Sequence, residues 1–164
     1  MNISFPSLES HHFPVMLNEV IKSCSPYKKG LVVDCTFGGG GYSKELLMRS
    51  ELQVIALDRD ESVKNIAQDL KKKYQNKFIF FREKFSNLDK MLSEDNKADV
   101  IIFDLGLSTM QLEDYKRGFS FKSKEKIDMQ MGLSDISAEE VINTLDEKNL
   151  KLVIKILGEE QEAN

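Results

Sequence analysis

The chain has 164 residues but only two cysteines, Cys24 and Cys35, and it has no apolar run approaching the length of a membrane span. Two cysteines provide no disulfide framework, and a membrane-spanning helix needs about 20 apolar residues in succession. The N-terminal stretch MNISFPSLES lacks the basic start and the apolar segment of a secretion signal. These absences predict a cytoplasmic protein that does not associate with membranes.

An excess of basic charge is also missing, since 23 basic residues stand against 27 acidic ones and the formal net charge is -4. Nucleic-acid-binding domains often show a strong basic balance. Any nucleic-acid site must therefore be a local basic patch, or lie outside this chain. What the sequence does have is the composition of a globular domain, 41% hydrophobic and 30% charged, at the length of one domain.

Short apolar runs alternate with amphipathic segments through the first two thirds of the chain. Their periodicity predicts strands at 31–35, 52–58, 77–83 and 98–106, and helices at 43–50, 61–74 and 86–95. Ser43 is a candidate N-cap for the first of these helices. The alternation of strand and helix predicts parallel strands joined by right-handed crossovers, in an α/β doubly wound sheet.

After Gly106 the alternation stops. A polar stretch with scattered aromatics and methionines follows, which is typical of a long loop with short pieces of structure, and loops of that length are often functional. Ser137 and Glu140 fit the capping box of a further helix. A last helix is predicted over 146–157, ended by Gly158.

Four glycines, Gly38 to Gly41, follow the first predicted strand in the stretch VVDCTFGGGGYS at 32–43. In an open parallel sheet, ligands bind beyond the carboxyl ends of the strands, and glycines allow a ligand to approach the backbone closely. Asp58 ends the second strand 20 residues after Gly38, a spacing that suits a carboxylate accepting hydrogen bonds from ribose hydroxyls. The alternative is that the glycines only make a tight strand-to-helix turn.

Two classes of cofactor use this arrangement. A dinucleotide places its pyrophosphate on a helix N-terminus, usually through GxGxxG; Gly38 and Gly40 fit the first two positions, but Ser43 occupies the third. S-adenosylmethionine has no phosphate and needs a glycine bend, a ribose carboxylate and a polar group near the adenine. The pattern therefore favours S-adenosylmethionine over NAD, with a nucleotide-dependent oxidoreductase as the competing hypothesis.

Eight sequence blocks extend the pattern from about His12 to Glu160. They are HHFPVMLNEV, DCTFGGGGYS, ALDRD, FSNLDKML, IIFDLGLSTMQLE, RGFSF, IDMQM and LGEE. In this order the chain resembles the ribosomal RNA small subunit methyltransferase H family. The resemblance implies a Rossmann-like class I methyltransferase core with an inserted helical domain. Residues 1–106 would form the S-adenosylmethionine-binding half, and residues 107–164 the substrate loop and the start of the insertion.

The resemblance also implies a reaction: methyl transfer from S-adenosylmethionine to the exocyclic amine (N4) of a cytidine in 16S RNA of the small ribosomal subunit. The cofactor contacts that it implies are Gly40, Gly41, Tyr42, Asp58, Phe85, Asp104 and Gln111. Among these, Asp58 would hold the ribose and Phe85 would lie beside the adenine. Asp104 is also the candidate catalytic group, because it lies where an acceptor for the amine hydrogen is needed; its alternative role is to hold the methionine end of the cofactor. No metal is implied.

Each of these residues has a structural alternative. Tyr42 could be a partly exposed aromatic whose backbone alone contacts the cofactor, and Phe85 could be a core residue. Asp104 could cap the turn that follows it, and Gln111 could be an ordinary loop residue. The RGFSF block could be a packing cluster, although two aromatics in a basic loop also suit base stacking and phosphate contact.

The chain departs from the family pattern at several positions. Thr109 and Met110 replace a usual serine and proline, Gln130 replaces an arginine, and Gln161 and Glu162 stand where a cation and an aromatic are expected. Family members also continue beyond the point where this chain ends. We therefore expect an incomplete sheet whose unpaired edge favours homo-oligomers, and small-subunit RNA as the partner. The alternative is a truncated, inactive fragment that retains at best cofactor or RNA binding.

Overall fold

The structure is a computed structural model, and it describes residues 14–49, 51–92, 97–134 and 136–163. The end of the predicted helix at 86–95 and the first residues of the HHFPVMLNEV block lie outside these ranges. The chain divides into two compact units, Met1–Met110 and Gln111–Asn164. Among the described residues, no helix is long and apolar enough to cross a membrane.

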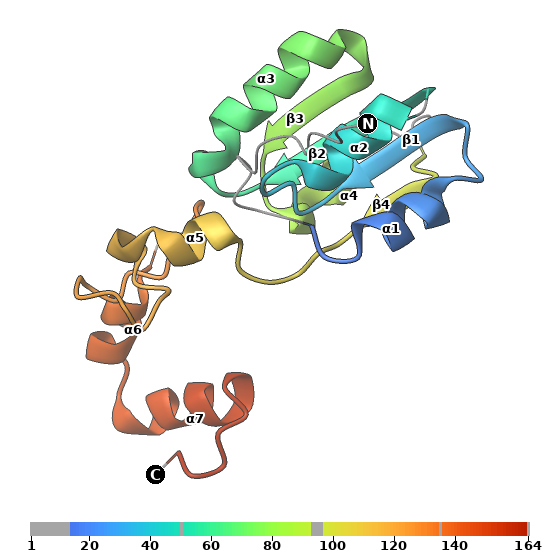
Figure 1. The fold of residues 1–164 in the computed structure, drawn as a ribbon. Coiled ribbons are helices and arrows are strands. Elements are labelled where there is room, and N and C mark those ends of the chain that lie inside the picture. The colour runs from blue at the N-terminus through green and yellow to red at the C-terminus, as the bar shows by residue number, and fades with distance from the viewer. Residues whose placement is uncertain (1–13, 50, 93–96, 135, 164) are drawn as a thin grey trace, which may run out of the picture. The chain divides into compact units, whose positions relative to one another are not determined.

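The first unit is built on a parallel sheet of four strands in the order β3-β2-β1-β4 (Figure 1). The strands are β1 (Lys29–Asp34), β2 (Glu51–Asp58), β3 (Phe78–Arg82) and β4 (Val100–Ile102). The predicted α/β doubly wound sheet is thus confirmed. Asp34 is in register with Ala56 of β2 and Ile102 of β4, so the carboxyl ends of these strands meet at one edge. The strand order reverses at β1, which makes that end the position where such folds bind ligands.

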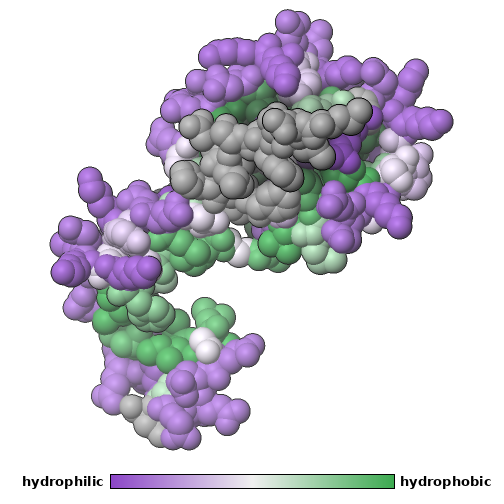
Figure 2. All heavy atoms as spheres, viewed as in Figure 1, coloured by the Kyte–Doolittle hydropathy of each residue, from purple (hydrophilic) through white to green (hydrophobic). Residues whose placement is uncertain are grey.

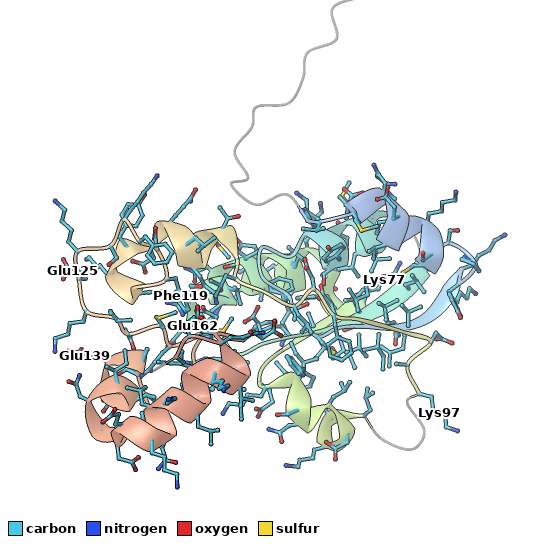
Figure 3. All side chains as sticks on the ribbon, turned by 90° about the horizontal axis from the view of Figure 1, so that it is seen from below. Lys77, Lys97, Phe119, Glu125, Glu139 and Glu162 are labelled. Carbon is cyan, nitrogen blue, oxygen red and sulfur yellow. The ribbon has the colours of Figure 1, made fainter. Side chains whose placement is uncertain are left out.

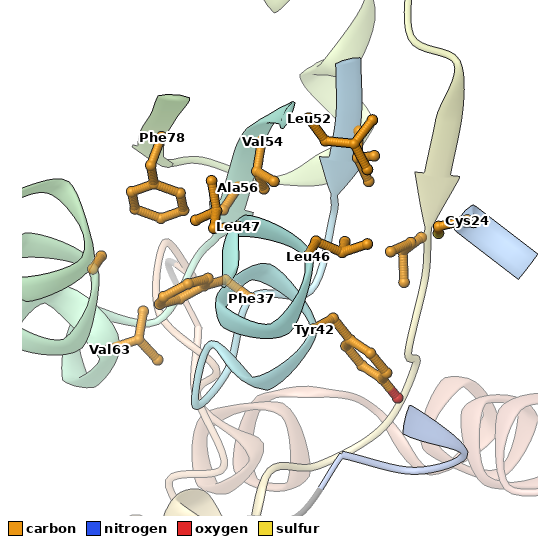
Figure 4. Close-up of a cluster of buried hydrophobic side chains, with 13 residues drawn as sticks. Cys24, Phe37, Tyr42, Leu46, Leu47, Leu52, Val54, Ala56, Val63 and Phe78 are labelled. Atoms are coloured by element: carbon orange, nitrogen blue, oxygen red, sulfur yellow. The ribbon is translucent and has the colours of Figure 1, made fainter. Parts of the chain in front are cut away.

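Three helices cover one face of the sheet, and a short one lies on the other. The first three are α1 (Leu17–Cys24), α2 (Gly41–Arg49) and α3 (Lys64–Tyr74), and the fourth is α4 (Leu88–Met91). Side chains along β2 alternate between the faces: Val54 and Ala56 join the cluster under α1–α3, drawn in Figure 4, whereas Ile55 and Leu57 pack with α4. Short 3-10 turns at Glu61–Val63, Gln75–Lys77 and Phe85–Asn87 join the elements.

β4 is shorter than its apolar run predicts. The run continues to Gly106, but the chain leaves the ladder after Ile102, and the backbone N–H of Asp104 donates to Thr36 Oγ1 (2.8 Å). Hydrophobicity alone could not show this, because Thr36 lies 68 residues away in sequence. The departure matters for the site, since it holds Asp104 beside the end of β1.

The second unit is mostly helix and loop. Its elements are α5 (Thr109–Glu113), which spans the boundary between the units, the 3-10 turn Tyr115–Arg117, α6 (Ala138–Thr144) and α7 (Glu147–Leu157). The predicted capping box is confirmed: Ser137 Oγ accepts from the Glu140 N–H, and Glu140 Oε2 accepts from the Ser137 N–H. Gly158 ends α7 as predicted. Apolar residues gather on α7 (Figure 2). Two of the apolar side chains of α7, Ile156 and Leu157, are exposed.

Candidate functional site

The glycine loop connects β1 to α2 at the carboxyl edge of the sheet. Gly38 and Gly40 have φ angles of 50° and 74°, in the left-handed region that favours glycine. A Cβ atom on Gly40 would lie 2.8 Å from Cζ of Phe37, whose ring is buried. The fold itself therefore requires Gly40, as the tight-turn interpretation expects. Evidence for a ligand must come from the polar groups around the loop.

Asp34 anchors this loop from beneath, a role that the sequence did not reveal. Ser43, predicted as an N-cap, instead lies inside the first turn of α2 and donates its hydroxyl to Asp34 Oδ2 (2.7 Å). The prediction was wrong because glycine is a poor helix former, so the helix start at Gly41 was not anticipated. Both side chains are completely buried. Burial raises the pKa of Asp34 to about 6, although the Ser43 hydrogen bond opposes the shift.

Asp58, at the end of β2, is hydrogen-bonded to the backbone of the glycine loop. Its Oδ2 accepts from the Gly38 N–H (2.8 Å) and its Oδ1 from the Asp60 N–H (2.9 Å). Burial raises the pKa of Asp58, and these backbone hydrogen bonds oppose the shift. A carboxylate offers about four acceptor positions, so the N–H groups of Gly38, Asp60 and Arg59 leave capacity for a ribose hydroxyl. The geometry thus suits the role expected for Asp58.

Asp104 lies across the same edge and is linked to Tyr42. The Tyr42 hydroxyl is 3.1 Å from Asp104 Oδ2 and 2.5 Å from the carbonyl oxygen of Val15, and its single proton can be donated to either acceptor. Burial, followed by the hydrogen bond to Asp104, raises the pKa of Tyr42 to about 12. The phenol therefore stays protonated, and its hydroxyl lies against the Asp104 carboxylate. The Tyr42 side chain is buried, so the alternative of a partly exposed aromatic on the first turn of the helix is wrong.

Phe85 follows β3 and remains 43% exposed, so it is not a core residue of the first unit. Its ring meets that of Phe103 edge to face, with 5.5 Å between the centroids, and Phe103 is 50% exposed. The sequence did not predict this contact of Phe103, because Phe103 follows β4, whereas Phe85 follows β3 at the opposite end of the strand order. An exposed aromatic pair offers an apolar surface for a base such as adenine.

Gln111 is buried on α5, at the boundary between the two units. Its part in cofactor binding remains a prediction.

The strand ends together carry three acidic side chains. Asp34 and Asp58 end β1 and β2, and Asp104 follows β4 at the same edge. Carboxylates repel a pyrophosphate but attract the sulfonium and ammonium groups of S-adenosylmethionine. The left-handed glycine loop, the free acceptor position of Asp58 and the exposed ring of Phe85 also fit that molecule. Across the described residues, no cluster of His, Cys, Asp or Glu could hold a metal ion.

A separate cavity of about 930 Å³ opens at the opposite edge of the sheet. Its lining includes Cys24 of α1, Leu46 and Leu47 of α2, and Leu52 of β2. It therefore lies at the amino ends of the strands, away from the three acids. The size of this cavity does not make it the candidate site, because Asp34, Asp58 and Asp104 do not line it.

Comparison with known proteins gives a consistent result. The family model described as "MraW methylase family" matches residues 9–164. The protein named "Ribosomal RNA small subunit methyltransferase H" from Orientia tsutsugamushi (strain Ikeda) is 41% identical over 153 residues, which are 93% of this chain and 49% of the relative. The protein of that name from Rickettsia bellii (strain OSU 85-389) is 45% identical, covering 93% and 50%. The chain thus spans about half the length of the curated relatives it matches.

Proposed function

The chain belongs to the MraW methylase family, and from this premise we propose that it acts in S-adenosylmethionine-dependent methylation of small-subunit ribosomal RNA, at the N4 amine of a cytidine in 16S RNA. The family uses S-adenosylmethionine as methyl donor, and the relatives' printed names specify the RNA of the small subunit. The observation that carries the proposal is the set of acids at the strand switch point, where Asp58 keeps an acceptor position beside the glycine loop.

The residues of the first unit divide the binding of the cofactor between them. The left-handed backbone at Gly38 and Gly40 lets the ligand pass close to the chain. Asp58 holds the ribose, Phe85 packs against the adenine, and Asp104 lies toward the reacting end. Tyr42 acts as a positioning residue, because its hydroxyl lies 3.1 Å from Asp104 Oδ2.

When bound, S-adenosylmethionine supplies an electrophilic methyl group, whose S–C bond breaks as the new N–C bond forms. The cytidine amine is conjugated with its ring and is a poor nucleophile, so a group that accepts its hydrogen assists the attack. Asp104 Oδ2 faces Tyr42, which leaves Oδ1 for that hydrogen bond. The amine proton then leaves to Asp104 or to water. The main contribution of the chain is to position the two reactants.

Asp104 could instead hold the methionine ammonium, and steady-state kinetics separates the two roles. If Asp104 contacts the amine, Asp104→Asn lowers kcat and leaves KM for S-adenosylmethionine nearly unchanged. If it holds the ammonium, the same variant raises that KM.

The proposal is tested by transfer of a labelled methyl group to undermodified small ribosomal subunits, followed by digestion of the RNA to nucleosides. Two proteins are compared: this chain, and this chain joined to the second half of the Rickettsia bellii relative. We expect label in N4-methylcytidine with the joined protein and little with the chain alone, because the relatives are about twice as long. Label in another nucleoside would contradict the proposed target, and no transfer by either protein would favour the inactive alternative.

A further inference from the structure

The loop at 115–126 in the second unit, here called the aromatic loop, has features that the methyl-transfer site does not use. We propose that it is a platform for single-stranded RNA, on which Phe121 stacks one unpaired base while Lys122 and Lys124 contact the neighbouring phosphates. The proposal rests on the proposed function only for the identity of its partner, an RNA.

Phe121 is the most exposed large apolar side chain among the described residues, with a relative exposure of 111%. The other aromatic of the RGFSF block behaves differently: the guanidinium of Arg117 lies over the Phe119 ring, with its carbon 5.4 Å from the centroid. A phenylalanine held entirely in water gains by stacking on a flat apolar partner. The two rings of one short motif therefore have different roles, one in packing and one facing outward.

Hydrogen bonds fix the tip of the aromatic loop. The Ser120 carbonyl oxygen accepts from the Ser123 N–H (2.9 Å), and Ser120 Oγ accepts from the Lys122 N–H (3.2 Å). Ser123 Oγ in turn donates to the carbonyl oxygen of Tyr115 (2.5 Å). These contacts define a turn with Phe121 at its apex. A ring presented by an ordered turn loses little further freedom when it binds, which favours affinity.

The base of the loop is held by the IDMQM block. The Met129 N–H donates to the Arg117 carbonyl oxygen (2.8 Å), and Arg117 Nη2 donates to the Gln130 carbonyl oxygen (2.5 Å). Gly118 has a φ of 75°, and a Cβ there would lie 2.7 Å from the carbonyl oxygen of Lys126. The first half of RGFSF is thus a packing cluster, as one of the two interpretations expected, and this packing directs the second half into solvent.

The charge of the loop differs from that of the whole chain. Between 115 and 126 there are five basic residues and one acidic residue, whereas the chain carries a formal charge of -4. Lys126 is near Glu139, at 3.6 Å, while Lys122 and Lys124 are exposed beside Phe121 in sequence. Figure 3 labels Phe119 and Glu125 on this loop.

An exposed ring followed by two exposed cations matches single-stranded RNA. The bases of an unpaired strand stack on aromatic side chains, and its phosphates attract lysines. A protein partner would instead require a contiguous apolar patch, whereas the residues on either side of Phe121 in sequence are Ser120 and Lys122.

The chain contains no tryptophan, so Phe121→Trp places a single fluorophore at the apex of the loop. The variant chain is titrated with a ten-nucleotide single-stranded pyrimidine RNA and, separately, with inorganic polyphosphate of similar charge. Because a stacked base quenches indole emission, we expect saturable quenching by the RNA and little by polyphosphate. Phe121→Ala should weaken binding of a labelled copy of the RNA about five- to tenfold, at the lower end of typical base–aromatic stacking effects.

A pair of charge variants provides the matched control. Lys122→Gln with Lys124→Gln should reduce the salt dependence of RNA binding. Lys148→Gln with Lys155→Gln on α7 removes the same charge and should leave the salt dependence nearly unchanged.

Emission unaffected by RNA, equal quenching by polyphosphate, or unaltered affinity of Phe121→Ala would overturn the proposal that Phe121 stacks on RNA. Concentration-dependent, blue-shifted emission without RNA would overturn it too, by showing Phe121 in a protein contact. Normal RNA stacking by the chain, together with no methyl transfer by the protein joined to the second half of the Rickettsia bellii relative, would contradict only the proposed function.

Discussion

Replacing Asp58 by alanine should weaken the binding of S-adenosylhomocysteine by about 2 to 3 kcal/mol, which is about 30- to 150-fold in the dissociation constant. The ribose would lose a charged acceptor for which alanine has no substitute. The same carboxylate accepts from the Gly38 N–H, so the variant also loosens the glycine loop. Both consequences reduce affinity, and equilibrium dialysis with labelled ligand measures their sum.

Two further variants separate the ribose contact from other effects of Asp58. Asp69→Ala removes an equal charge from an exposed position on α3, where it pairs with Lys72, and should leave the affinity unchanged. Asp58→Asn retains the size of the side chain and one acceptor oxygen, and should give an intermediate loss. Thermal melts check that each variant remains folded. An Asp58→Ala protein that melts normally and binds as tightly as the original chain would place Asp58 outside the site.

The second large effect concerns Asp34 and pH. Burial raises the pKa of Asp34 from 3.8 to about 6, so the folded chain holds this proton more tightly than the unfolded chain. The contribution of Asp34 to stability is therefore fully present below about pH 3.8. It is lost as the pH rises through 6, by an amount on the order of 3 kcal/mol. Asparagine does not titrate in this window.

Urea unfolding of the original chain and of Asp34→Asn between pH 4 and pH 7 measures this contribution. The free energy of unfolding of Asp34→Asn, relative to that of the original chain, should rise by on the order of 3 kcal/mol over this range. Loss of one acceptor for Ser43 or Thr36 adds an offset that does not change with pH. A difference that is constant across the range would show that Asp34 ionises as freely in the folded chain as in the unfolded one.

The sheet and the helix ends of the second unit were predictable because their signals are local. Alternating or continuous apolar runs define β1 and β2, whose side chains fill both faces of the sheet. Ser137 and Glu140 cap a helix through contacts three residues apart. Such short-range patterns can be recognised without knowing the rest of the fold.

The features that the sequence did not reveal depend on partners distant in the chain. Tyr42 reaches Asp104 over 62 residues, and Phe103 pairs with Phe85 although β3 and β4 lie at opposite ends of the strand order. Ser43 is drawn into a buried hydrogen bond instead of capping its helix. In each case the tertiary contact decided the role of a side chain whose local context suggested another.

Calorimetric titration of the chain with S-adenosylhomocysteine, and separately with NAD, tests most directly whether the acids at the strand switch point form a S-adenosylmethionine site. The left-handed glycine loop, the acceptor positions of Asp58, and Ser43 in place of the third glycine of GxGxxG all predict saturable one-site binding of S-adenosylhomocysteine. NAD should give no saturable heat, since its pyrophosphate would face carboxylates. Saturable binding of NAD with no response to S-adenosylhomocysteine would contradict the account.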